Sequence, residues 1–197
     1  MIMIMRRIVA FLIVLVSAIM PLTAEDYREL FSVGNPIDYC GEKFYFAYSV
    51  TPRYGYYLQE YLPEGQSFDD FKQMFSVAII FGNETPEAFV ANKIAELEER
   101  KKTDPVINYI AMQKDDNHVL DFIVSQGDGE KVNVVEENVY CYRQVTIGGR
   151  QAVMLCFLSD RAYGDDILPF IKDIPNHWVE RFEGMAKLRL SPEMIMK

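Results

Sequence analysis

Three short turn sequences between residues 106 and 159 constrain the fold more than any other feature of this chain. They separate four β-rich segments, 106–113, 119–126, 132–147 and 151–159. The turns themselves are residues 115–118, 127–130 and 148–149, and they consist mostly of Asp, Asn and Gly. Short turns of this composition join antiparallel neighbours. The sequence therefore predicts a four-stranded antiparallel meander.

The two-glycine turn at 148–149 also predicts a register for the last two strands. A two-residue loop places Ile147 opposite Arg150, and counting back along both strands places Cys141 opposite Cys156. A cross-strand cysteine pair lies within range for a disulfide. The same two residues can instead be buried free thiols, and Cys40, the third cysteine, could pair with either one.

Upstream of the meander, three further segments rich in β-branched and aromatic residues predict strands. They are residues 43–50, 56–62 and 74–81. Between the last two, Ser67 predicts the N-cap of a short helix over 68–72.

Capping and proline signals predict the remaining helices. Thr85 is a good N-cap and Pro86 suits the first position of a helix that should end near Lys102. In the tail, we expect one helix over 165–174 and a last helix that begins at residues 175–176, where a proline interrupts the pattern.

Together these elements predict an α+β fold, with an antiparallel sheet of about six or seven strands covered by helices. Their order resembles the PsbP-like (Mog/PsbP) α/β/α sandwich, and residues 60–77 (EYLPEGQSFDDFKQMFSV) resemble a stretch of uncharacterised exported bacterial proteins. The resemblance covers most of residues 43–190. It implies a binding or assembly role rather than catalysis, and it carries no functional residue over to this chain.

Residues 1–24 have the order of a secretory signal peptide. Arg6 and Arg7 precede an apolar run over 8–20, and the small residue Ala24 ends the segment. The run is shorter than the roughly 20 apolar residues of a membrane-spanning helix. We therefore expect cleavage after Ala24, a periplasmic or secreted protein, and no membrane span afterwards. The rest divides into an extended lead-in (25–42), a single α+β domain (43–190) and a loose tail (191–197).

The acidic composition narrows the classes of partner. Loss of Arg6 and Arg7 lowers the net charge from −9 to −11. Such a surface repels phosphate backbones and gains no counterion release from them. We therefore expect neither nucleic acid nor an anionic membrane surface as a partner, but a protein or small ligand of the cell envelope. Solubility alone also accounts for the charge.

The sequence contains no recognisable catalytic, cofactor or metal motif. His118 follows two aspartates and an asparagine and could belong to a cation site, but these residues also favour turns for their own hydrogen bonds. His177 could act as a general base, yet no serine or cysteine has triad spacing around it. Asp128 and Glu130 lack the spaced ligands of a calcium loop. We expect no catalytic, cofactor or metal site; the alternative is a small exported hydrolase assembled from distant residues.

Tyrosines in two adjacent strands are the best candidates for a binding surface. The candidate residues are Tyr45, Tyr54, Tyr56, Tyr57 and Tyr61. Tyrosine is favoured at interfaces and could contact a sugar, a peptide or a protein. Strand alternation predicts that Tyr48 shares a face with Phe46, opposite to Tyr45. Ordinary cross-strand packing also explains these tyrosines without any binding role. For the protein as a whole, the leading hypothesis is an exported binding or assembly module without catalysis.

Overall fold

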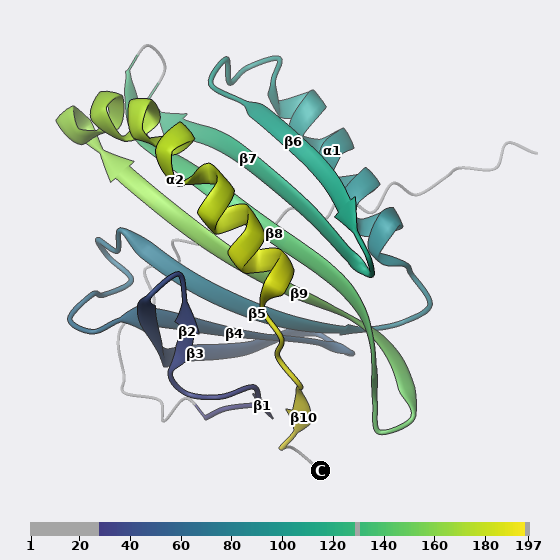
Figure 1. The fold of residues 1–197 in the computed structure, drawn as a ribbon. Helices are drawn as coiled ribbons and strands as arrows, with labels where there is room; N and C mark the ends of the chain where they lie inside the picture. The colour runs from purple at the N-terminus through teal and green to yellow at the C-terminus, as the bar shows by residue number, and fades with distance from the viewer. Residues whose placement is uncertain (1–27, 129–130, 196–197) are drawn as a thin grey trace, which may run out of the picture.

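The computed structural model describes residues 28–128 and 131–195, and its main feature is an eight-stranded antiparallel sheet that curls into a half-barrel (Figure 1). The strand order is β2-β3-β4-β5-β9-β8-β7-β6. The strands are β2 (Ile37–Tyr39), β3 (Glu42–Arg53), β4 (Tyr56–Pro63), β5 (Gln73–Phe81), β6 (Asn108–Lys114), β7 (Asn117–Gly127), β8 (Val132–Ile147) and β9 (Arg150–Tyr163). Two short strands, β1 (Phe31–Ser32) and β10 (Glu193–Met194), pair with each other.

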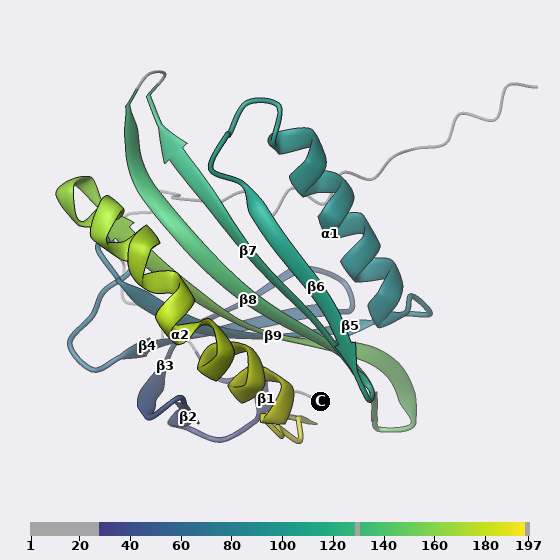
Figure 2. The ribbon, with the colours of Figure 1, turned by 45° about the horizontal axis from the view of Figure 1, so that its top comes forward.

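Two α-helices pack on opposite faces of the sheet (Figure 2). Helix α1 (Pro86–Arg100) joins a core cluster that includes Leu120 of β7, whereas α2 (Ile167–Lys187) joins one that includes Val119. Neighbouring strand residues point to opposite faces, so we call these the α1 face and the α2 face. A single 3-10 turn, η1 (Gly164–Asp166), precedes α2.

The predicted helix-covered α/β/α sandwich is wrong. The described part of the chain is mostly β, with 51% of its residues in strands and 23% in helices. The described residues contain only two α-helices, and both pack on the β7–β9 part of the sheet. The rest of the sheet buries its apolar side chains largely by curling, which brings Tyr39 of β2 and Phe44 of β3 against Phe75 of β5. Self-burial of this kind replaces the helix layer that the order of the predicted elements suggested.

The local predictions around the meander are confirmed. Strands β6 to β9 are consecutive antiparallel neighbours, and Ile147 lies opposite Arg150 across the two-glycine turn. Cys141 lies opposite Cys156, as the register predicted. Thr85 caps α1, where its hydroxyl oxygen accepts a hydrogen bond from Ala88 N at 3.3 Å.

Four local predictions differ from the structure. Residues 68–70 form a turn and 71–72 are irregular rather than helical, because Ser67 hydrogen-bonds the Asp70 carboxylate rather than a backbone N–H. The tail forms one helix through Pro175, and its second half is fixed by packing against the sheet. His118 lies in β7 and is buried, because the preceding turn contains only residues 115–116. The predicted lead-in contains the strands β1 and β2, and the tail that was expected to be loose contains β10.

The predicted signal peptide lies outside the described residues. Within residues 28–128 and 131–195, neither helix combines the length and the apolar character that crossing a membrane requires.

Candidate functional site

Three carboxylates and one arginine meet under α2. Asp121 of β7, Glu137 of β8 and Asp160 of β9 occupy positions on the α2 face, each buried to 7% exposure or less. Arg181 of α2 reaches down between the last two and forms salt bridges with both Glu137 and Asp160. A backbone contact holds the same turn of the helix, because the Tyr39 hydroxyl donates to the Arg181 carbonyl at 2.6 Å. We call these four charged residues the carboxyl cluster.

Burial shifts the protonation of this cluster. Loss of hydration raises the pKa of Asp121 to about 7, and the neighbouring charge of Glu137 adds to this effect. Burial also raises the pKa of Glu137, against the opposing effect of Arg181. One arginine cannot neutralise three carboxylates, so the cluster holds a proton near neutral pH.

The carboxyl cluster contains a buried polar atom without a hydrogen-bond partner, Glu137 Oε1. Trp178 of α2 lies beside the cluster, where its indole N–H opposes the rise in the pKa of Asp121. Perturbed acids and unpaired atoms are typical of functional sites, yet Glu137 is only 1% exposed. The cluster therefore suits a helix clamp better than a site that receives substrate. The carboxyl cluster was not identified from the sequence. The available signal was that each of the three acids occupies a strand position that alternates with its neighbours to face the core, next to apolar residues.

The five candidate tyrosines do not form one surface. Tyr61 is fully buried and Tyr56 is 8% exposed, and they belong to core clusters on opposite faces of the sheet. Tyr57 is half-buried and packs edge-on against the ring of Phe81. Only Tyr45 and Tyr54 are well exposed, at 40% and 87%.

A β-bulge in β3 changes which aromatic residues share a face. Phe46 lies opposite Tyr61 and Tyr48 lies opposite Glu60, so Ala47 is an extra residue between two pairs. The bulge moves Tyr48 to the face of Glu60, which Tyr45 also shares through its pairing with Leu62. The predicted alternation, with Tyr48 opposite to Tyr45, is therefore wrong, because strict period two fails at a bulge.

A hollow of about 310 Å³ lies at this bulge, and we call it the β3 hollow. Its lining residues come from β3, β4 and the following turn: Tyr45, Phe46, Ala47, Leu62, Pro63, Glu64, Gly65 and Gln66. Apolar packing of Leu62 with Phe71 and Met74 supports its floor. Gln66 Oε1 accepts hydrogen bonds from Lys72 N at 2.7 Å and Gln73 N at 3.1 Å. These contacts fix the turn, so the hollow is already formed without a ligand.

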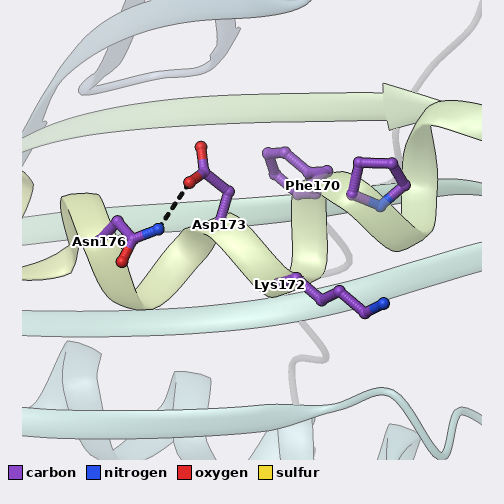
Figure 3. Close-up of a pocket in the computed structure, with 5 residues that line it drawn as sticks. Phe170, Lys172, Asp173 and Asn176 are labelled. Atoms are coloured by element: carbon purple, nitrogen blue, oxygen red, sulfur yellow. Dashed lines mark hydrogen bonds between the residues drawn. The ribbon is translucent and has the colours of Figure 1, made fainter.

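A second hollow, of about 490 Å³, lies on α2 (Figure 3). Its lining residues Pro169, Phe170, Lys172, Asp173 and Asn176 all belong to this one helix. Asn176 donates a hydrogen bond to Asp173 at 2.8 Å, and Figure 3 shows both on consecutive turns. A single helix surface cannot enclose a ligand, so this hollow is a weaker candidate than the β3 hollow.

Each histidine pairs with a carboxylate. His118 Nε2 lies 3.1 Å from Glu87 Oε1, and His177 Nε2 lies 2.6 Å from Asp173 Oδ2. Among the hydrogen bonds of the described residues, neither imidazole contacts a serine or cysteine. No group of three or more His, Cys, Asp or Glu side chains in that part of the chain could hold a metal ion.

All three cysteines are free thiols. Cys141 and Cys156 are buried, and loss of hydration raises the pKa of Cys156 to about 12. Cys40 is exposed and points toward α2, with its sulfur 3.7 Å from the Glu180 carbonyl oxygen. The buried pair thus behaves as small apolar residues of the core.

Comparison with known proteins identifies the family to which the chain belongs, but no individual relative. A protein-family model, that of an uncharacterised family, matches residues 31–190. Nothing in this match links the chain to the PsbP-like fold. No curated protein matches it. The match runs from β1 to just beyond α2 and so includes both the carboxyl cluster and the β3 hollow. The protein therefore belongs to this uncharacterised family.

Proposed function

We propose that the protein is an exported, non-catalytic binding module that holds an aromatic side chain of a partner protein in the β3 hollow. The observation that carries this proposal is the coincidence of an exposed tyrosine, a β-bulge and a preformed hollow at one place. Bulges often lie beside functional sites, where they redirect side chains.

The size and lining of the β3 hollow favour this ligand. A volume of about 310 Å³ is at the lower end for ligand sites, so it suits one ring better than a whole cofactor. Tyr45 offers an exposed aromatic face, and aromatic pairs gain from offset or edge-to-face packing. Buried aromatic anchors of this kind supply much of the binding energy in protein interfaces.

The charge of the surrounding turn favours a basic partner segment. Glu64, Asp69 and Asp70 are all exposed in the turn between β4 and β5. Lys72 lies in the same turn but pairs with Asp166 at 3.5 Å. Complementary charge speeds association and selects partners. Aromatic residues flanked by lysine or arginine are therefore the expected recognition element.

Site-specific photo-crosslinking in living cells tests this proposal. A photoreactive benzophenone amino acid would replace Tyr45 in one variant and Tyr54 in the other. Both positions are exposed, but only Tyr45 lines the β3 hollow. We expect the first variant to capture a discrete protein partner and the second to capture none. Equal capture from both positions, or none from Tyr45, would refute the proposal.

A further inference from the structure

The two edges of the eight-stranded sheet differ sharply. One edge is β2, which has only three residues. The other is β6, which has seven residues and pairs with β7 without any register shift. Natural sheets usually shorten, kink or cover their edges, because an exposed edge strand is a template for another strand. Among the described residues, β6 pairs with no strand besides β7, and Lys114 at its end is the only such protection that it carries.

Apart from Tyr109, which packs against the α1-face cluster, the side chains of β6 are exposed on both faces of the sheet. Ile110 and Met112 point to the α2 face and are 45% and 47% exposed. Ala111 and Gln113 point to the α1 face and are also exposed, so α1 does not cover this part of the strand. Exposed apolar side chains on an unprotected edge indicate an interaction surface.

We propose that β6 pairs with β6 of a second copy of this chain and forms a symmetric dimer. Two-fold symmetry makes such a pair antiparallel and isologous. In the register centred on Ala111, each Ile110 lies opposite Met112 of the other copy, which gives two apolar cross-strand pairs on one face. Asn108 then lies opposite Lys114, so no like charges meet. The strand is thus complementary to itself, which favours a second copy over an unrelated strand.

Sedimentation equilibrium of the purified protein tests the interface. We expect a reversible dimer, and Ile110→Lys should weaken it at least about tenfold, since a lysine replaces an apolar cross-strand partner. Val179→Lys is the matched control, because Val179 is 57% exposed but lies on α2. A monomer at all soluble concentrations would overturn the proposal. A dimer that Val179→Lys disrupts and Ile110→Lys leaves intact would do the same.

Cysteine crosslinking tests the register separately. In a Cys40→Ser background, Ala111→Cys places two thiols opposite each other, within the Cα range of a disulfide. Gln113→Cys is the control, because its two copies would lie about 13 Å apart along the strands. We expect a rapid disulfide dimer from the first variant only. Faster crosslinking of the Gln113→Cys variant than of the Ala111→Cys variant would overturn the proposed pairing. The absence of crosslinking in both variants would also overturn it.

Discussion

Arg181 of α2 forms a salt bridge with Asp160 of β9 in a setting where both side chains are almost fully buried. A second nitrogen of the same guanidinium bridges to Glu137. This arrangement ties α2 to two strands of the sheet. Removing one partner of a buried ion pair leaves an uncompensated charge, which typically costs about 3–5 kcal/mol.

We therefore predict that Arg181→Met strongly destabilises the protein, by about 3–5 kcal/mol in urea unfolding at neutral pH. Lys187→Met is the control, because Lys187 pairs with Glu183 on the exposed side of the same helix. It should leave the free energy of unfolding close to that of the parent. Similar values for both variants would contradict the clamp.

Asp121→Asn should change how stability depends on pH. The folded state raises the pKa of this carboxyl from 3.8 to about 7, so the folded protein retains a proton that the unfolded chain releases above about pH 4. The free energy of unfolding therefore falls as the pH rises from about 4 to about 7. The asparagine has no charge to bury.

Relative to the parent, the Asp121→Asn variant should gain stability across this window, by up to about 4 kcal/mol at roughly 1.4 kcal/mol per pKa unit. Chemical unfolding at pH 4 and pH 8 measures the change. A stability difference between variant and parent that is the same at both pH values would contradict the raised pKa.

Gly184→Ala should destabilise the protein although alanine favours helices. A Cβ at Gly184 would lie 2.8 Å from the Cys40 sulfur and 3.4 Å from the Tyr39 ring. Overpacking costs about 1–3 kcal/mol and the helix gains about 1 kcal/mol, so a net loss of about 1 kcal/mol is expected. Gly82→Ala, where no atom lies within 4 Å of the new Cβ, is the control. Adding Cys40→Ala should restore most of the loss; failure to do so would show that Cys40 is not the obstacle.

Alkylation should distinguish the three thiols. In native protein at pH 8, we expect modification of Cys40 alone, because Cys40 is exposed whereas Cys141 and Cys156 are buried and inaccessible to the reagent. All three should react after unfolding without reductant. Mass spectrometry counts the added groups. If unfolded, unreduced protein accepts a single group and that group is on Cys40, a Cys141–Cys156 disulfide exists and the free-thiol arrangement is wrong.

Local signals predicted the meander, its two-glycine turn and the cap of α1, since each depends on a few neighbouring residues. The Cys141–Cys156 register followed from one two-glycine turn in the same way. Pairing of β5 with β9 could not be predicted, because it joins strands about 80 residues apart by packing rather than by a turn. The same limit made the fold class wrong, since curling of the sheet depends on such long-range contacts.

The candidate site was predictable only in part. Tyr45 was singled out from its position in an aromatic strand, but Tyr56 and Tyr61 shared the same pattern and are buried. Strand alternation alone cannot say which face of a sheet is covered. Nor can it reveal the extra residue at Ala47, which shifts the later part of β3 by one position and shapes the β3 hollow.

Titration of isotope-labelled protein with indole, followed by amide NMR, is the most direct test of binding in the β3 hollow. We predict saturable shifts at Tyr45, Ala47, Gly65 and Gln66 and none over residues 170–176. Tyr45→Ser should weaken the interaction up to about tenfold, whereas Tyr54→Ser should not. Shifts confined to α2, or no saturable shifts at the β3 hollow, would contradict the account.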